Sequence, residues 1–363
     1  MTRRFIAWAR RHAAWLRFVI GIALGLLALW AVAGQRGELT DAAREIGHLS
    51  IPWFSVAVIS EFLSVVAFAR MQGTLISSGN VRIPAGRLVT MTAGAGAIAS
   101  SIPAGPAASS FFAYRQYRRF GADEALAGWT LIATLVSSAL GLSLLTTAGL
   151  ALATRQGAAF DLIGAVIGVL FAAVIAAVIL QRRRALSRFG LGVLRLVRRL
   201  TGRPRRHETE VLAGLMARLG RVDIGWREMA RALAWSLGYW AADCGALAFG
   251  YLAVHASIPW TALLLAYGAG QLASNLPITP GGLGVVEGSL TIALVAYGGA
   301  QASTVGAVLI YRIVSFWGFL PLGWLAYLGV KVKDARADRA AAASAGEVVP
   351  VEMAADEAWE EAQ

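Results

Sequence analysis

Apolar residues run along this chain in blocks long enough to cross a bilayer. Continuous runs of that length stand at residues 15–34, 51–70, 124–152, 160–180, 232–255 and 303–330. A membrane-spanning helix needs about 20 predominantly apolar residues, so the pattern predicts about six full spans. Two further apolar runs, at 88–113 and 258–299, are interrupted by Gly, Ser and Pro, which disfavour a helix interior. The pattern predicts an all-α polytopic membrane protein.

Both interrupted runs are centred on nearly the same short stretch. Residues 94–106 read GAGAIASSIPAGP, and residues 268–280 read GAGQLASNLPITP. Seven of the thirteen positions match, and each copy carries its two prolines at the same places. Small residues also let membrane helices pack closely, and a chain rich in Ala and Gly produces such matches by chance. The aligned prolines and the spans on either side favour an internal repeat.

Basic residues gather on one side of the predicted spans. The chain carries 33 Lys and Arg against 21 Asp and Glu, a formal net charge of +12. With a cytoplasmic N-terminus, 29 of the 33 basic residues flank the cytoplasmic ends of the spans, as the positive-inside rule requires. These clusters border apolar spans rather than a nucleic-acid module, so the expected partner is anionic membrane lipid and no nucleic acid. We expect both termini in the cytoplasm.

The same rule sets the direction of the two interrupted runs. Arginines both precede and follow the run at 88–113, so both of its ends belong in the cytoplasm. The run at 258–299 lies between an outward and an inward span, so both of its ends are external. The chain therefore predicts two re-entrant, broken-helix hairpins that enter from opposite faces. That is the arrangement of an inverted repeat whose broken helices meet near the midplane and line a substrate cavity.

We therefore expect a single transmembrane domain over residues 1–340, with repeat halves at 51–152 and 232–330. The basic segment 181–231 is typical of amphipathic helices on the cytoplasmic membrane surface, which either fix orientation or gather anionic lipid. Residues 341–363 form an acidic, Ala-rich tail that is expected to be disordered or loosely helical. The sequence does not decide whether the protein forms a homo-oligomer, because small-residue motifs are weak evidence in a chain with 40 glycines.

Four ionisable residues lie well inside the apolar runs: Glu61, Asp243, Glu287 and Arg312. Each costs about 2.5–3.5 kcal/mol at the centre of a bilayer, so each needs a partner or a wet cavity. Arg312 keeps its proton and must face an anion. That anion is either an internal carboxylate, from Glu287 or Asp243, or the phosphate of a lipid headgroup, and the two are compatible if the lipid displaces the internal partner.

Glu287 follows a glycine-rich break, PITPGGLGVVE, at which a new half-helix begins. The first turn of a helix presents free N–H groups and a partial positive charge, which favour anions. Glu287 there either stabilises its own helix or acts as a gate that a substrate phosphate displaces. Glu61 is either functional or a structural, hydrogen-bonded acid. Ser100 and Asn275, beside the prolines, either line a polar path or cap the broken helix ends.

The sequence contains none of the common motifs for nucleotide binding, hydrolysis or metal binding. The sequence has no Walker motif, no G-x-S-x-G elbow and no soluble stretch long enough for a catalytic domain, so we expect no enzyme, no catalytic residues and no cofactor. The four histidines are scattered, and no second ligand stands at metal-binding spacing, so no metal site is expected. The single cysteine, Cys244, cannot form an intrachain disulfide.

Two C-terminal stretches are similar to a known family. NLPITPGGLGVVEGSL (275–290) and AVLIYRIVSFWGFLPLGWLA (307–326) closely resemble the end of the lysylphosphatidylglycerol synthase transmembrane-region family, also described as flippase-like membrane proteins. IPAGPAASSFFAYRQYRRFGA followed by ALAGW resembles the family's first hairpin in an actinobacterial-type variant. The similarity covers most of residues 50–330.

The resemblance implies a lipid-handling membrane domain, which in fused members moves aminoacylated phosphatidylglycerol to the outer leaflet. This chain departs from the wider family at residues 108–112, where small and aromatic residues replace an acid and an Arg. No stretch of these residues resembles the aminoacyl-transferase domain of fused members, so synthesis of lysyl lipid is not expected. The resemblance and the residues together predict a substrate site at Glu61, Ser100, Pro103, Asn275, Pro277, Pro280, Gly281, Gly282, Gly284, Glu287 and Arg312.

The expected function is lipid translocation in the bacterial plasma membrane. The substrate would be an anionic phospholipid or a polyprenyl-phosphate-linked lipid that passes through a cavity between the two hairpins. Three alternatives stay open: an accessory subunit that presents a lipid-linked substrate to a separate transferase, a small-ion transporter, and a structural scaffold.

Overall fold

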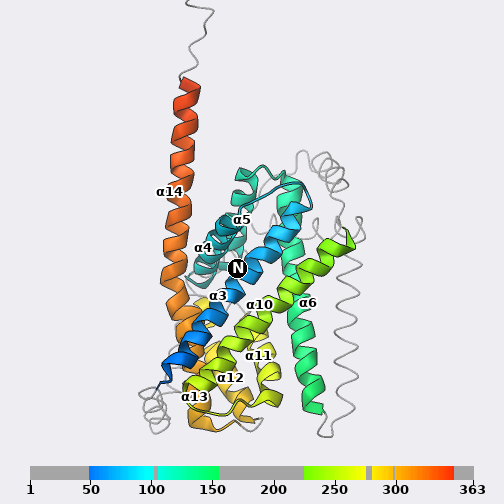
Figure 1. The fold of residues 1–363 in the computed structure, drawn as a ribbon, viewed down its shortest axis with the longest axis vertical. Helices are drawn as coiled ribbons and strands as arrows, with labels where there is room; N and C mark the ends of the chain where they lie inside the picture. Colours follow the sequence, from blue (N-terminus) through cyan, green and yellow to red (C-terminus); the bar gives the residue numbers. More distant parts are fainter. Residues whose placement is uncertain (1–48, 102–104, 155–224, 275–279, 297–298, 347–363) are drawn as a thin grey trace, which may run out of the picture.

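The computed structural model describes residues 49–101, 105–154, 225–274, 280–296 and 299–346. All regular structure in these ranges is helical, as the hydropathy pattern predicts. Figure 1 shows the arrangement. The helices are α3 (Ile51–Ser77), α4 (Ala85–Ser101), α5 (Gly105–Arg119), α6 (Glu124–Thr154), α10 (Trp226–Ala253), α11 (Trp260–Ser274), α12 (Val285–Ala296), α13 (Gln301–Arg312) and α14 (Phe319–Gly346), with a short 3-10 turn η1 (Pro280–Gly282) and a π-helical segment η2 (Ile313–Gly318).

Three described segments are long and apolar enough to cross a membrane: Ile51–Ser77, Glu124–Leu150 and Gln301–Ala340. They establish an integral membrane protein. The span predicted at 232–255 falls in α10, which has 28 residues but is less apolar than these three. The spans predicted at 15–34 and 160–180 lie outside the described residues. The full number of spans therefore stays a prediction.

The centre of the fold is the pair α3 and α10, which pack against each other along much of their length. They run antiparallel: the N–H of Ser50, before α3, donates to the carbonyl of Ala253 at the end of α10 at 2.9 Å. Midway, the hydroxyl of Ser60 donates to the carbonyl of Ala242 at 2.7 Å. Buried alanines on both helices allow this close approach. α10 also packs on α6 and α13 and so connects the two halves of the chain.

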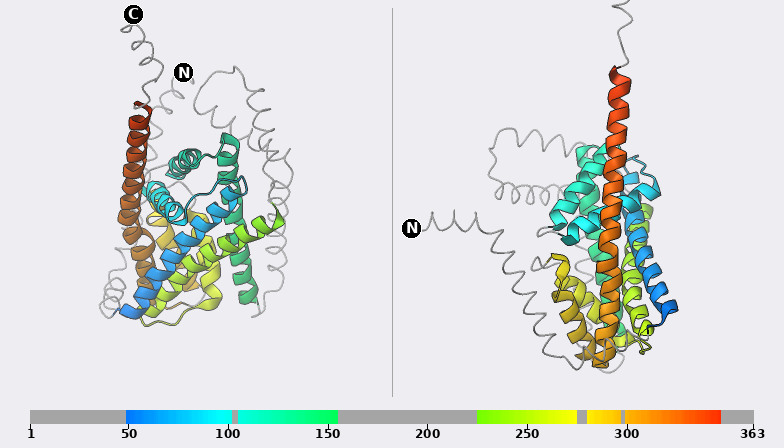
Figure 2. Two further views of the ribbon diagram at one scale, coloured as in Figure 1. Left: turned by 45° about the horizontal axis from the view of Figure 1, so that its top comes forward. Right: turned by 90° about the vertical axis from the view of Figure 1, so that its left-hand side faces the viewer.

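The two interrupted runs fold into helix pairs, α4 with α5 and α11 with α12. The views in Figure 2 place the first pair toward one end of the molecule and the second toward the other. α4 also contacts η1, so the first pair reaches the break of the second. Gly94 and Gly323 let α4 and α14 meet closely, since a side chain at Gly94 would come within 3.1 Å of the backbone of Tyr327.

Two predicted boundaries shift in the structure. α10 begins at Trp226, so the last residues of the segment 181–231 form the exposed first turns of this long helix rather than a separate surface helix. α14 continues to Gly346, so the start of the predicted tail at 341–363 is helical. Hydropathy places both boundaries poorly, because a helix that leaves an apolar layer keeps its hydrogen bonds while its side chains become polar. The remainder of both segments lies outside the described residues.

Candidate functional site

The glycine-rich break is a tight turn that ends where α12 begins. Gly281, Gly282 and Gly284 have φ values of 60°, 69° and 78°, in the left-handed region that favours glycine. Gly281 has a second constraint, because an added Cβ would lie 2.1 Å from the ring of Phe316. The turn therefore depends on glycine both for its backbone angles and for its contact with the π-helical segment.

Arg312, the last residue of α13, reaches this turn. Its residue surface is only 7% exposed. Its Nε donates to Oε1 of Glu287 at 2.6 Å, and an amino group donates to the carbonyl oxygen of Gly281 at 3.1 Å. The guanidinium also lies over the ring of Phe316, 4.6 Å from its centroid. The π-helical segment begins directly after Arg312, and such segments are frequent at functional sites.

Glu287 binds both Arg312 and the start of its own helix. While Oε1 accepts from Arg312, Oε2 accepts the N–H of Gly284 at 2.7 Å. Its carboxylate thus occupies the position at the N-terminus of α12 that an external anion would take. Of the partners considered for Arg312, Glu287 makes the direct ion pair in this structure.

Asp243 of α10 forms a second polar centre beside the first. Its Oδ2 accepts hydrogen bonds from Tyr267, from Tyr311 at 3.0 Å and from Gln271 at 3.1 Å. Gln271 also donates to the Tyr311 hydroxyl at 3.1 Å. Tyr311 precedes Arg312 in α13, and Arg312 is close enough to Asp243 for an electrostatic interaction. Consecutive residues of one helix therefore connect the two centres.

Glu61 of α3 faces Asp243 rather than Arg312. The two carboxyl groups are close enough to interact, because α3 and α10 meet at the preceding residues, where the hydroxyl of Ser60 donates to the carbonyl of Ala242 at 2.7 Å. Oε2 of Glu61 is buried and receives no hydrogen bond from the described part of the chain. The structure thus separates the predicted acids into a Glu287–Arg312 pair and a Glu61–Asp243 pair.

The remaining predicted site residues either lie beside the breaks of the two helix pairs or fall outside the described residues. Ser100 is partly buried near the end of α4, next to Ser101, whose hydroxyl accepts the indole N–H of Trp324 at 3.0 Å. Pro280 begins η1, directly before the glycine turn. Pro103, Asn275 and Pro277 lie outside the described residues. Their part in a site stays a prediction.

The sequence reasoning passed over the hydrogen-bond donors around Asp243: Tyr267, Gln271 and Tyr311. One signal was present, because Gln271 stands where the first copy of the repeat has Ala97, which puts a polar amide into an apolar helix. Tyrosines give no comparable signal, since they occur at many buried positions.

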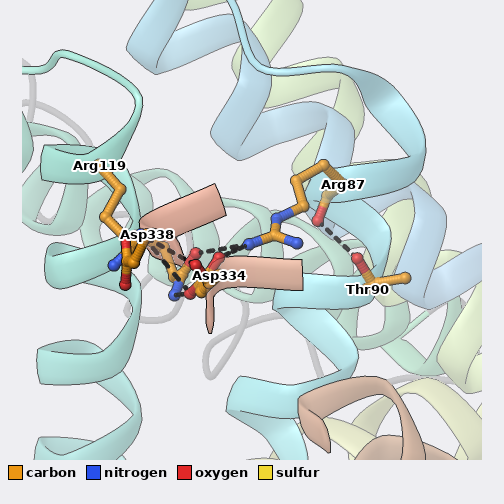
Figure 3. Close-up of polar contacts among 6 residues, drawn as sticks. Arg87, Thr90, Arg119, Asp334 and Asp338 are labelled. Carbon is orange, nitrogen blue, oxygen red and sulfur yellow. Dashed lines mark hydrogen bonds and ion pairs between the residues drawn. The ribbon is translucent and has the colours of Figure 1, made fainter. Parts of the chain in front are cut away.

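A third polar cluster, which we call the α14 clamp, holds the far part of α14 to the first hairpin (Figure 3). Asp334 pairs with Arg87 of α4 and accepts the side-chain amide of Gln116 of α5 at 2.8 Å. Arg119 pairs with Asp338 one turn further on and lies 3.7 Å from Asp334. The side chains of Arg87 and Asp334 are only 12% and 13% exposed, so the clamp is largely withdrawn from water.

Comparison with known proteins bears on these sites. Residues 18–323 match the family model described as lysylphosphatidylglycerol synthase TM region. The chain belongs to this family. A UPF0104 membrane protein of Methanothermobacter thermautotrophicus is 44% identical over 82 residues, which cover 22% of this chain and 23% of that relative. The family match extends over the glycine turn, Glu287 and Arg312, and the relative shares only about a quarter of its own length with this chain.

We expect Gly281→Ala to destabilise the break of this family member. The left-handed backbone and the Phe316 contact together should lower the free energy of unfolding by roughly 2–4 kcal/mol. Gly288→Ala in α12 is the matched control, because nothing lies within 4 Å of its added methyl group. Thermal unfolding of the detergent-solubilised protein measures both variants. Equal unfolding temperatures would contradict the described turn.

Proposed function

We propose that this protein translocates a lipid with an anionic phosphate group, either a phospholipid or a polyprenyl-phosphate-linked lipid, across a bacterial plasma membrane. Arg312 would bind the phosphate, and Glu287 would hold Arg312 when no lipid is present. The observation that carries the proposal is the buried guanidinium whose one close carboxylate partner, among the described residues, also fills an anion position at a helix N-terminus.

The competition between Glu287 and phosphate has a physical basis. A phosphate has oxygens that can accept hydrogen bonds from both the guanidinium and the N–H of Gly284. It can therefore replace both contacts of the Glu287 carboxylate. An arginine without an anion inside a membrane is costly, which means that one of the two acceptors must stay bound. Such an exchange would keep the site closed until a lipid arrives.

The arrangement of the helices supports a path for the lipid. In chain order, a long helix, a broken pair and a second long helix occur twice: α3, α4–α5 and α6, then α10, α11–α12 and α13–α14. The broken pairs lie toward opposite ends, and α4 reaches η1. We interpret this as the inverted repeat of a transporter, with its site where the breaks approach. The name of the family also points to lipid as the substrate class.

The test is native mass spectrometry of the gently purified protein, with opposite expectations for two variants. Arg312→Gln should lose a specific phosphate-bearing lipid by about tenfold or more, as expected for the loss of a charged hydrogen-bond donor. Glu287→Gln should retain more of it, because the internal competitor is gone. Arg118→Gln, which changes an exposed arginine in the last turn of α5, is the control for the loss of one positive charge.

Two results would overturn this function. If all variants keep the same unselective lipid mixture, Arg312 is a structural partner of Glu287. If inorganic phosphate raises the unfolding temperature of the wild type but not of Arg312→Gln, and no lipid is retained, the site serves a small anion.

A further inference from the structure

The pair formed by Glu61 and Asp243 lies in the most closely packed part of the fold. Glu61 belongs to α3 and Asp243 to α10, the two helices that form the centre. Asp243 is 6% exposed, and one oxygen of Glu61 is fully buried. Two ionised carboxylates that face each other across a buried helix contact repel each other. A buried acid pair is stabilised by a cation that the two carboxyl groups share, and a proton is the smallest such cation.

Hydrogen-bond donors are distributed unequally over the pair. Oδ2 of Asp243 accepts from three side chains, which is the environment of an ionised carboxylate. Oε2 of Glu61 is buried and has no donor among the described residues. An ionised oxygen would need such a donor, whereas a protonated carboxyl group supplies its own. The proton accordingly belongs on Glu61, which donates it to Asp243.

We propose that Glu61 and Asp243 form a proton-binding site, and that binding of a phosphate group at Arg312 favours proton uptake by this site. The second part rests on the proposed function for its anion, while the first does not. Glu61 takes one proton from water when the site is protonated and returns that proton to water when the site is deprotonated. No other reactant is involved. Lipid and proton would then move together.

The coupling follows from the position of Arg312. Its positive charge acts on Asp243 and favours ionisation of the acid pair. A phosphate at Arg312 cancels part of that charge, so the protonated pair gains stability. By reciprocity, protonation of Glu61 strengthens phosphate binding. Tyr311 joins the two sites directly, because it donates to Asp243 and precedes Arg312.

The other titratable groups near the pair do not supply a competing charge at neutral pH. Burial keeps tyrosine and cysteine side chains neutral, so Arg312 is the one cation among the described groups that act on Asp243. The groups that interact with the pair are Tyr239 and Cys244 of α10, Tyr267 of α11, and Tyr311 and Arg312 of α13.

Dicyclohexylcarbodiimide tests this site, because it adds to protonated carboxyl groups in apolar surroundings and leaves carboxylates unmodified. Peptide mass spectrometry of the labelled protein should show a Glu61 adduct at neutral pH that declines as the pH rises. Glu287, which forms an ion pair with Arg312, is the internal control and should stay unlabelled. Arg312→Gln should increase labelling of Glu61 several-fold, whereas Glu287→Gln should decrease it, because the freed guanidinium then acts on Asp243. Short-chain phosphatidylglycerol should increase labelling in the wild type and have no effect in Arg312→Gln.

The outcomes separate the two parts of the proposal. A wild-type protein that is unlabelled at Glu61 at every pH has no such proton site. Labelling that neither variant changes would overturn the coupling to Arg312. Labelling that responds to both variants but not to phosphatidylglycerol would support the proton site and count against the proposed lipid. A misfolded variant would be recognised by added labelling at carboxyl groups outside the two acid sites, such as Asp334, which stay unlabelled in the wild type.

Discussion

Glu287→Gln should destabilise this protein by about 3–5 kcal/mol in lipid-free detergent, more than Arg312→Gln does. The first variant leaves a buried guanidinium with no anionic partner in direct contact among the described residues, and arginine cannot discard its proton. The second leaves a carboxylate that keeps its bond to the N–H of Gly284 and is 22% exposed. Chemical unfolding followed by tryptophan fluorescence measures both.

The double variant tests whether the effect belongs to the pair. Arg312→Gln with Glu287→Gln removes both charges, so it should be more stable than Glu287→Gln alone. Addition of an anionic lipid should raise the stability of Glu287→Gln more than that of the double variant. If the two single variants lose nothing and the double variant is additive, the ion pair makes no net contribution to the fold.

Asp334→Asn should open the α14 clamp, with a loss of about 2–4 kcal/mol. Asp334 neutralises the charge of Arg87, and both side chains are largely buried. Replacing the carboxylate with an amide therefore leaves a poorly hydrated arginine without its anion. The same change weakens the contact of α14 with Gln116 and Arg119. We expect faster tryptic cleavage after Lys331, Lys333, Arg336 and Arg339, read by mass spectrometry.

Asp338→Asn is the matched control for the clamp. It also removes one carboxylate from α14, but the side chain of Asp338 is 64% exposed and its partner Arg119 is 35% exposed. Exposed ion pairs contribute about 0–1 kcal/mol, so cleavage should change little. Equal cleavage of the two variants would show that burial of Arg87 and Asp334 does not hold the helix.

The sequence predicted the frame of this fold because each signal is local. Apolar length places α3 and α6 to within a few residues at most ends, and the interrupted runs mark the two helix pairs. Gly281, Gly282 and Gly284 were predicted to form a turn, since three glycines in four positions have few other uses in an apolar run. The family assignment from the stretch around Glu287 and Arg312 is confirmed by the match over residues 18–323.

The sequence could not choose among long-range partners. Arg312 had Glu287 and Asp243 as candidates, and only packing of α13 against α10 and α12 decides between them. Glu61 and Asp243 are 182 positions apart, so no spacing rule brings them together. The α14 clamp was missed for the same reason: Asp334 follows Lys331 and Lys333, and it resembles any charged residue that follows a span.

The continuity of α13, η2 and α14 has a mechanical consequence. Gln301–Gly346 forms one helical rod with a single irregular point, the π-helical segment directly after Arg312. Asp334 lies roughly 33 Å along this rod from Arg312, at 1.5 Å per residue. If the proposed exchange of the anion at Arg312 tilts the rod about this irregular point by about 5°, Asp334 would move by roughly 3 Å. The clamp at Asp334 would then report, at one surface of the protein, which anion Arg312 holds.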